Sequence, residues 1–188
     1  WIELCDNDNK VHGKILTLKT ITGRMAHHSP NMAQIPAVYS PYGKECRECW
    51  TVSDTNNYSL VGTDANGLEL RCLAHYMNDR QFTNEIGKIV GGDPKKGQQL
   101  INRFLSNMPS LRVLRNKVQD ASQKGIIRGL DGRLLHIRSS HSALNTLIQS
   151  AGAVVCKHWL LDIMSLIKKT RIDAKLVASI HDEYQFEV

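Results

Sequence analysis

The chain has 188 residues, of which 41% are hydrophobic and 22% charged, a composition typical of a globular protein with a sizeable core. Lysine and arginine outnumber aspartate and glutamate by 24 to 18, and the net charge of +6 favours a polyanionic partner, although a merely basic globular protein fits equally well. The five cysteines, an odd number, argue against a disulfide-stabilised scaffold, and the longest apolar run, 151–156, is too short to cross a bilayer. We therefore expect a protein of a reducing, cytoplasmic compartment with no membrane partner.

The first third of the chain predicts little regular structure. Residues 1–20 predict two short strands on either side of a polar turn at 6–10. The segment 22–43 contains three prolines and predicts an ordered loop, because it cannot form one long helix or a central strand. The CxxC at 46–49 lacks a second ligand pair at a zinc-binding spacing and a thioredoxin-like context, so we interpret it as incidental.

The middle of the chain predicts one strand and three helices. Residues 58–65 predict a buried strand, and a helix follows over 67–80 with apolar residues at helical spacing. The pattern breaks between 85 and 92. Helices are then expected over 95–107 and 109–123, the second opened by a proline, which the first turn of a helix tolerates.

The last third predicts two hairpins separated by a long helix. Residues 125–138 predict a hairpin with an Asp-Gly turn, and residues 175–188 predict a second one, tight around Asp182. Between them a helix is expected over 141–168, capped by one of the two preceding serines. Its core side is expected to consist of Leu144, Leu147, Ile148 and Val155.

Two aspartates lie where a metal site would need them. Asp64 ends the strand at 58–65, and Asp182 lies at the tip of the last hairpin beside Glu183. Adjacent acids at a hairpin tip are most often a solvated turn. A second acid at another strand end favours a metal site, because two carboxylates can hold two divalent cations about 4 Å apart for phosphoryl transfer, and oxygen ligands favour Mg²⁺.

The long helix carries a polar stripe. His141, Asn145 and Gln149 recur every four residues and therefore share one face of the helix. Such a stripe is often only a solvent-exposed face. Amides are also suited to the minor-groove acceptors that all base pairs offer, which would give DNA binding without sequence preference.

Four segments together resemble a known family. In chain order they are TGRMAHHSPNMAQIP, DANGLELRCLAHYM, GLDGRLLHIRSSHSALNTLIQSAGAVVCK and HDEYQFEV. They resemble the family A DNA polymerases, the phage replicative branch more closely than bacterial DNA polymerase I, over nearly the whole chain. The resemblance implies an α+β fold: a polymerase palm, with an antiparallel sheet backed by helices, and a partial helical fingers region. The implied division is 1–80 for the first part of the palm, 81–124 for partial fingers, and 125–188 for the fingers-to-palm helix and the palm hairpin.

The resemblance implies roles at a catalytic centre. Asp64 and Asp182 match the family's two catalytic, metal-binding aspartates, and Glu183 matches their less direct catalytic neighbour. Ala65 would lend its backbone carbonyl to the metal. Glu69 would crowd the sugar 2′ position of the incoming nucleotide and so favour deoxynucleotides.

The resemblance also implies contacts with DNA. Arg24 matches an arginine that reaches the minor groove at the last base pair of the primer, and His181 would lie near the primer terminus. The other implied DNA-binding residues are Asn31 and Gln34 at the duplex backbone, and Asn145 and Gln149 in the groove near the template. His141, on the same helix face, stands where the bacterial enzymes have arginine.

The implied reaction is template-directed DNA synthesis, in which a primer 3′-hydroxyl attacks a dNTP with two Mg²⁺ ions as cofactors. The implied partners are primer–template DNA, dNTP, and a processivity factor recruited through a thumb that these residues lack. The implied location is the host-cell cytoplasm if a bacteriophage encodes the protein.

One family element is missing from the sequence. The family carries a fingers helix with Arg, Lys and Tyr along one face, which binds the incoming triphosphate, and here Ile86 runs directly into Gly87. Shorter gaps are expected near 123–124 and 170–174. The abrupt junctions favour the retained parts of a longer polymerase over a truncated remnant that only binds nucleic acid. A metal-dependent nuclease is a third possibility, since paired aspartates serve that chemistry too.

Overall fold

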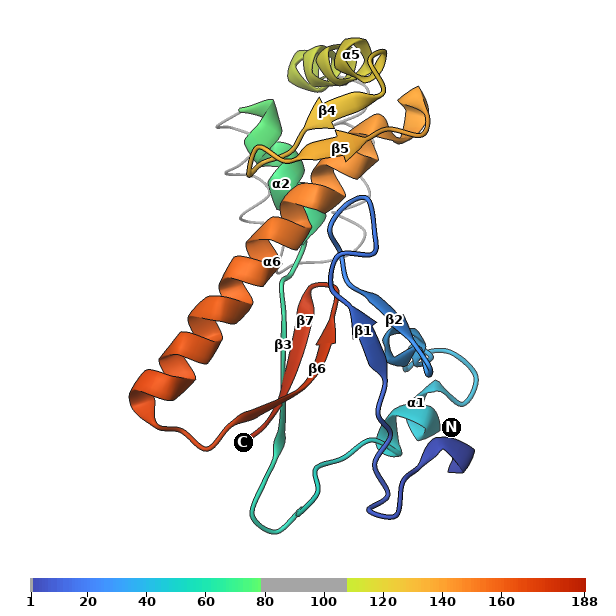
Figure 1. Ribbon diagram of the computed structural model, residues 1–188, viewed down its shortest axis with the longest axis vertical. Coiled ribbons are helices and arrows are strands. Elements are labelled where there is room, and N and C mark those ends of the chain that lie inside the picture. The colour runs from blue at the N-terminus through green and yellow to red at the C-terminus, as the bar shows by residue number, and fades with distance from the viewer. Residues whose placement is uncertain (1, 79–107) are drawn as a thin grey trace. The chain divides into compact units, whose positions relative to one another are not determined.

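The computed structural model describes residues 2–78 and 108–188, and it combines helices with antiparallel sheets (Figure 1). The α+β prediction is therefore confirmed. The expected break at 85–92 and the expected helix at 95–107 lie outside the described residues. The predicted fingers region, 81–124, is described only from residue 108 onward. The chain divides into two compact units, the first formed by Trp1–Asp64 and Cys156–Val188 and the second by Ala65–Val155.

The first unit contains a three-stranded antiparallel sheet in the order β3–β7–β6. Its strands are β3 (Leu60–Asp64), β6 (Lys175–Ile180) and β7 (Glu183–Glu187), and an irregularity in the β6–β7 register lies between Leu176 and Ala178. The C-terminal hairpin is thus confirmed. The prediction that residues 58–65 form a buried strand is wrong in one respect, because β3 is an edge strand with Leu60 40% and Val61 43% exposed.

The N-terminal part of the first unit differs more from the prediction. Only one strand, β1 (Lys14–Leu16), lies within 1–20, and it pairs with β2 (Ala26–His28) from the segment expected to be a loop. The residues before the polar turn form a 3-10 helix, η1 (Ile2–Leu4), in place of the other expected strand. A second 3-10 helix, η2 (Met32–Gln34), and a short helix, α1 (Gly43–Glu48), follow in the proline-rich region.

The second unit contains the predicted helices and hairpin. These elements are α2 (Leu68–Met77), α5 (Pro109–Ser122), β4 (Ile126–Arg128), β5 (Leu134–His136) and the 3-10 turn η3 (Ser140–Ser142). The long helix α6 (Ala143–Thr170) follows, and the boundary between the units falls within it. Gly132, at the tip of the β4–β5 hairpin, has a φ of 82°, a left-handed conformation that glycine adopts without strain.

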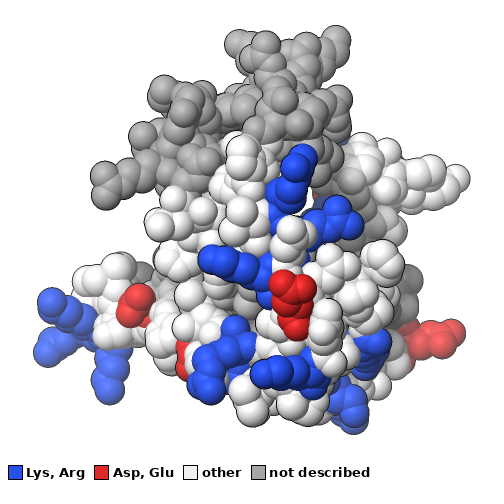
Figure 2. All heavy atoms as spheres, turned by 90° about the horizontal axis from the view of Figure 1, so that it is seen from above, with Lys and Arg blue, Asp and Glu red and all other residues white. Residues whose placement is uncertain are grey.

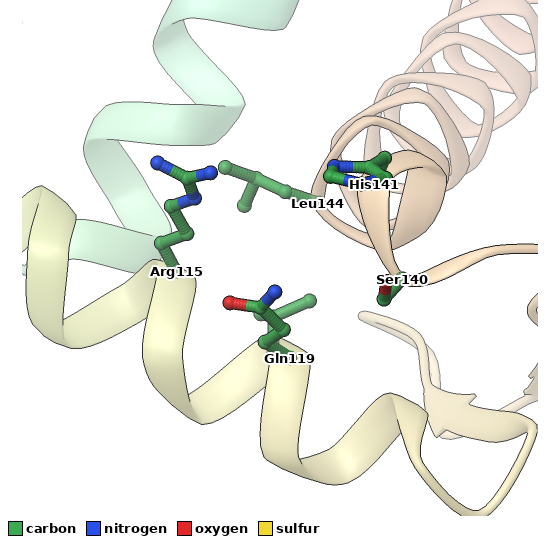
Figure 3. Close-up of a pocket in the computed structure, with 6 residues that line it drawn as sticks. Arg115, Gln119, Ser140, His141 and Leu144 are labelled. Atoms are coloured by element: carbon green, nitrogen blue, oxygen red, sulfur yellow. The ribbon is translucent and has the colours of Figure 1, made fainter.

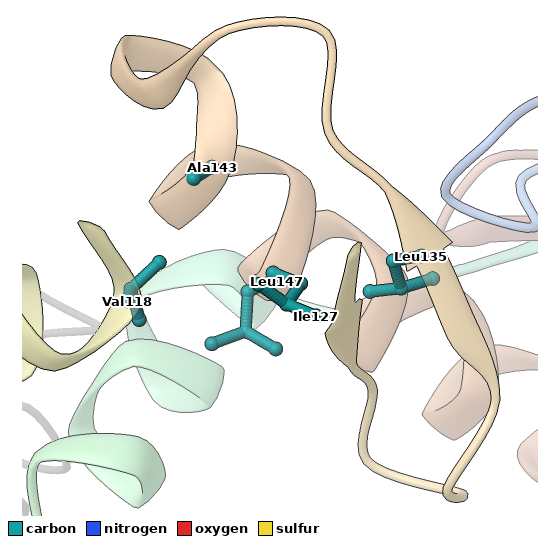
Figure 4. Packing of buried hydrophobic residues seen from close by; sticks show 5 residues of the cluster. All are labelled: Val118, Ile127, Leu135, Ala143 and Leu147. Carbon is teal, nitrogen blue, oxygen red and sulfur yellow. The ribbon is translucent and has the colours of Figure 1, made fainter. Parts of the chain in front are cut away.

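The core of the second unit is built where α5, the β4–β5 hairpin and the start of α6 meet. Figure 4 shows its buried side chains, which are Val118, Ile127, Leu135, Ala143 and Leu147. A second cluster is centred on Ala74 and Met77 of α2, against which Leu111 and Leu114 of α5 pack. Burial of Leu147 and Ile148 agrees with the predicted core side of the long helix, whereas Val155 is 42% exposed and does not belong to it.

One described helical stretch, Ser140–Thr170, is long and apolar enough to cross a membrane by length and composition alone. The prediction from apolar runs did not anticipate this, because polar residues interrupt the stretch. The property is weak evidence for a membrane span, since a helix that supplies a protein core passes the same test.

Candidate active site

The acids predicted to bind metal come together at one end of the three-stranded sheet. Asp64 is the last residue of β3 and lies directly opposite Glu183, the first residue of β7. Asp182 precedes Glu183 in the two-residue turn that joins β6 to β7. Antiparallel pairing therefore unites at one sheet end two aspartates that are far apart in the sequence.

The open face of the sheet at this end carries the carboxylates. Residues directly opposite each other in an antiparallel pair share a face, so Asp64 and Glu183 lie on the same side. Gln185, two residues along β7, donates a side-chain hydrogen bond of 2.7 Å to Glu183 Oε1. A Cβ atom built on Gly62 would lie 3.9 Å from the same oxygen, an ordinary van der Waals contact. Gly62 therefore lies beside the Glu183 carboxylate, and Gln185 orients that carboxylate.

The opposite face of the sheet is buried and anchored to α6. Tyr184 and Phe186 alternate with the polar residues of β7 and are 1% and 3% exposed. The Tyr184 hydroxyl donates a 2.7 Å hydrogen bond to the carbonyl of Cys156, and its ring packs edge-on against Trp159 at 5.1 Å between centroids. Burial raises the pKa of Tyr184 well above its ordinary value, so the hydroxyl remains a proton donor.

A histidine pair lies beside the turn. His181 has a φ of 54°, the left-handed conformation that a tight turn requires. Its ring meets that of His27 on β2 edge-on, with 6.2 Å between the centroids. The Nε2 atom of His27 is buried and has no hydrogen-bond partner among the described residues. Burial, together with the nearby His181, lowers the pKa of His27.

The other predicted DNA contacts of the first unit lie on the segment around β2. Arg24 is half-buried, and its carbonyl accepts a 2.7 Å hydrogen bond from the Thr20 hydroxyl. Asn31 caps η2, since its side-chain oxygen accepts a 3.1 Å hydrogen bond from the Ala33 N–H. Gln34, at the end of η2, is exposed. Asn31 thus has a structural role whether or not it also contacts DNA.

The remaining predicted residues belong to the second unit. The Ala65 carbonyl accepts a 3.3 Å hydrogen bond from the Leu68 N–H, which leaves one lone pair available to another partner. Glu69 lies exposed in the first turn of α2. His141 lies in η3 and is exposed, whereas Asn145 and Gln149 lie in the first two turns of α6, the former exposed and the latter half-buried.

The chemistry of the first unit's donors suits a hard divalent cation. In the described parts of the chain, no three His, Cys, Asp or Glu side chains form a metal-binding group of their own. The donors that Asp64 and Asp182 offer are carboxylate oxygens, which Mg²⁺ prefers while it keeps water and substrate oxygens in its remaining positions. The residues therefore fit a magnesium site that substrate completes, and they do not form a closed structural zinc site.

Three residues at this site escaped the sequence interpretation. Gly62 lies beside the Glu183 carboxylate, Tyr184 anchors β7, and Gln185 orients Glu183. The alternation of polar and apolar residues in EYQFE is the signal for Tyr184. Gly62 and Gln185 carry no such signal, because only the register between β3 and β7 places them together.

Comparison with known proteins gives the same family by sequence. The model of the family described as DNA polymerase family A matches residues 2–93 and 83–188. The DNA-directed DNA polymerases of Enterobacteria phage T3 and Escherichia phage T7 are each 32% identical over 252 residues, which cover 98% of this chain and 36% of theirs. DNA polymerase I of Bacillus subtilis is 24% identical over 240 residues, covering 96% of this chain and 27% of its own.

The alignments are longer than the chain itself. The phage enzymes align over 252 residues, whereas the chain has 188, so they contain residues within this span that have no counterpart here. The chain also spans only about a third of the length of these relatives.

A solved structure agrees at the level of the fold. The polymerase domain of Pol1 from M. smegmatis, in complex with DNA primer–template and dNTP, matches 99% of this chain and 43% of its own. The TM-score is 0.79 and the sequence identity 18%. With the family model and the phage relatives both covering nearly all its residues, the chain belongs to DNA polymerase family A.

Proposed function

We propose that this chain carries the palm of a DNA-directed DNA polymerase, which transfers a nucleotide from a dNTP to the 3′-hydroxyl of a primer. The observation that carries the proposal is the meeting of Asp64, Asp182 and Glu183 at one end of the β3–β7–β6 sheet. In our proposal residues 1–80 and 125–188 contribute the palm with its connecting helix, and residues 81–124 contribute part of the fingers.

The proposed site acts by positioning and charge. Asp64, Asp182 and the carbonyl of Ala65 would hold two Mg²⁺ ions, which when bound lower the pKa of the primer hydroxyl and neutralise the leaving pyrophosphate. Glu183, held by Gln185, adds negative charge beside Asp182 and helps to hold the site's geometry. No covalent intermediate with the protein is needed, because phosphoryl transfer depends mainly on alignment and electrostatic stabilisation.

The proposed partners are primer–template DNA and dNTP. Support comes from the solved relative from M. smegmatis, a complex with DNA primer–template and dNTP. We assign Glu69 to selection of the deoxyribose, and Arg24 and His181 to the primer end. The remaining proposed DNA contacts are Asn31, Gln34, His141, Asn145 and Gln149. We also propose that a processivity factor is recruited outside these residues. The proposed place of action is the cytoplasm of a host cell.

Primer extension by the natural full-length protein tests the proposal. Asp64→Ala and Asp182→Ala should each reduce extension by at least about a thousandfold, because each removes a ligand of the ions that stabilise the transition state. Both variants should retain duplex affinity in an anisotropy assay. Asp162→Ala, which removes an exposed carboxylate from α6, is the matched control and should extend normally.

The outcomes separate the competing functions. Retained extension in either site variant would falsify the assignment of the two aspartates. A natural protein that binds duplex DNA in a salt-sensitive manner, without Mg²⁺ and without extension, would instead be a nucleic-acid-binding remnant, to which the net charge of +6 is suited. Shortening of a labelled primer in the absence of dNTP would indicate nuclease activity.

A further inference from the structure

A cavity of about 240 Å³ lies in the second unit, between α5 and the start of α6. Figure 3 shows Arg115 and Gln119 projecting from α5 on one side and Ser140 and His141 on the other. Arg115 and Gln119 are four residues apart, so they share one face of α5. The apolar lining consists of Val118 and Leu144. The cavity thus has a polar rim over a small apolar floor.

The polar groups at this rim are available to a ligand. Among the described residues, no hydrogen bond or ion pair engages the side chain of Arg115, Gln119, Ser140 or His141. Arginine offers a fork of N–H donors, and the amide, hydroxyl and imidazole can each donate as well. The beginning of the 28-residue helix α6 adds the positive end of a helix dipole. Four side chains that can all donate hydrogen bonds, with no carboxylate among the residues that line the cavity, suit an anion.

The charge of the surrounding unit favours the same ligand. The described residues of the second unit carry eight lysines and arginines against three aspartates and glutamates. Seen from the end at which Figure 1 shows α5, the charged side chains visible in Figure 2 are more often lysine and arginine than aspartate and glutamate. Most of the unit's basic residues are exposed; they include Arg112, Lys124, Arg128 and Arg138. Such a surface attracts a polyanion, and the cavity offers it one specific point of attachment.

We propose that this cavity, defined by Arg115, Gln119, Ser140 and His141, binds one backbone phosphate of the template strand. The inference rests on the proposed function, from which it takes the identity of the strand. His141 lines the cavity, and the turn η3 that contains it leads directly into α6, which carries Asn145 and Gln149, the residues that we assign to the groove near the template. Since Arg115 and Gln119 line the same cavity as His141, a strand held at His141 would come within their reach. These two residues are new sites of contact, and Arg115 provides the charge-assisted bond.

The chemistry of the cavity determines what it can discriminate. A phosphate contact positions a strand without reading its sequence, because every nucleotide carries the same group. The apolar floor formed by Val118 and Leu144 gives the sugar a surface to rest on. We therefore expect the cavity to fix the path of the template while leaving template sequence unrestricted.

Binding of a fluorescent primer–template with a 5′ template overhang, measured with the natural full-length protein, tests the inference. Arg115→Ala should weaken binding roughly tenfold and reduce the slope of log K against log salt by about 0.7 to 0.9, the change expected for one lost phosphate contact. Lys117→Ala is the matched control, because it removes a cation from the opposite face of the same helix. It should change the affinity by less than about twofold.

A second pair of variants adds a negative charge, either inside the cavity or just outside it. Gln119→Glu places a carboxylate beside the proposed phosphate and should weaken binding more than Gln119→Ala does. Gln123→Glu introduces the same charge one turn further along, at the end of α5 and outside the cavity lining. It should leave the affinity nearly unchanged.

Neutral methylphosphonates placed singly along each strand identify the phosphate. One template position should weaken binding to the wild type but not to Arg115→Ala, whose contact is already lost. The proposal would be overturned if the Arg115 and Lys117 variants lost equal DNA affinity. It would also be overturned if the methylphosphonate position that depends on Arg115 lay on the primer strand. If the protein extends primers normally but no methylphosphonate position depends on Arg115, only this inference fails. If one template position depends on Arg115 but the protein extends no primer, only the proposed function fails.

Discussion

Tyr184 shows how one side chain holds the candidate site in place. It follows Glu183 directly, so the residue that anchors β7 is the neighbour of an acid at the sheet end. Its hydroxyl bonds to the Cys156 carbonyl from a position that is 1% exposed. A buried hydrogen bond of this kind stabilises a fold by about 1 kcal/mol.

We predict that Tyr184→Phe lowers the free energy of unfolding by about 1 to 2 kcal/mol, because the Cys156 carbonyl loses its donor from outside the helix. Urea unfolding of the full-length protein measures the effect. Tyr76→Phe is the matched control, since the buried Tyr76 hydroxyl has no hydrogen-bond partner in the described chain. Its removal should be neutral or slightly stabilising, and equal losses in the two variants would contradict the assignment.

Glu187 is a buried acid at the other end of β7. Its carboxylate accepts hydrogen bonds of 2.9 Å from both the backbone N–H and the hydroxyl of Ser53, and Lys175 Nζ lies 3.7 Å away. These bonds to the charged form, the backbone one foremost, lower the pKa of Glu187 from its ordinary value of 4.5. The folded chain therefore binds this proton less tightly than the unfolded chain does.

The resulting stabilisation depends on pH in a definite direction. It is complete above the ordinary pKa of 4.5 and is lost as the pH falls through the lower pKa of the folded state. We predict that Glu187→Gln destabilises the protein at neutral pH and that its difference from wild type shrinks below about pH 4.5. Unfolding free energies from neutral to acid pH provide the measurement.

The control for this titration is an acid on the surface. Glu48 lies 3.6 Å from Lys44, and both side chains are more than half exposed. Glu48→Gln should change stability little at any pH, since solvent screens exposed ion pairs. A constant difference between Glu187→Gln and wild type across the whole pH range would rule out the proposed linkage.

At the scale of elements, the close approach of α2 and α6 depends on one glycine. A Cβ atom on Gly152 of α6 would lie 3.1 Å from Leu68 Cδ2, at the start of α2 and next to Glu69. Alanine is favoured over glycine within a helix by up to about 1 kcal/mol, so steric contact and helix propensity oppose each other here.

We predict that Gly152→Ala is more favourable in a Leu68→Ala background than in the wild type, by about 1 kcal/mol. In that background the added methyl group meets no side chain, and the gain in helix propensity appears alone. A double-mutant cycle of unfolding free energies measures the coupling. Additive effects of the two substitutions would show that the Leu68 side chain can move away from the added methyl group without a loss of stability.

At the scale of the whole molecule, metal dependence and DNA binding should be separable. In the proposed function Mg²⁺ is needed for transfer, whereas duplex affinity comes largely from lysines and arginines that neutralise phosphates. We predict that a chelator abolishes primer extension by the full-length protein and leaves duplex binding intact, with an affinity that falls as salt rises. Anisotropy and extension measured in the same buffers test this. Extension that persists after complete chelation would contradict the magnesium assignment.

Local patterns predicted most of the regular elements. Helices α2, α5 and α6 have apolar residues at helical spacing, and both β4–β5 and β6–β7 are hairpins whose partners are adjacent in the sequence. The pairing of β1 with β2 was missed, because three-residue strands carry almost no periodicity. Helix α1 was missed as well, since it has only six residues and no side-chain cap.

The sequence alone determined the family resemblance, the α+β class and the placement of Asp64 at a strand end and Asp182 in a hairpin turn, because these follow from ordered motifs and short-range periodicity. Only the tertiary structure decided that β3 is an edge strand, that Glu183 lies opposite Asp64, and that Gly62 and Gln185 adjoin it. The cavity beside Arg115 also depends on tertiary structure, since two separate helices supply its donors. Pairing register and helix packing are long-range properties, and no local pattern in a single sequence contains them.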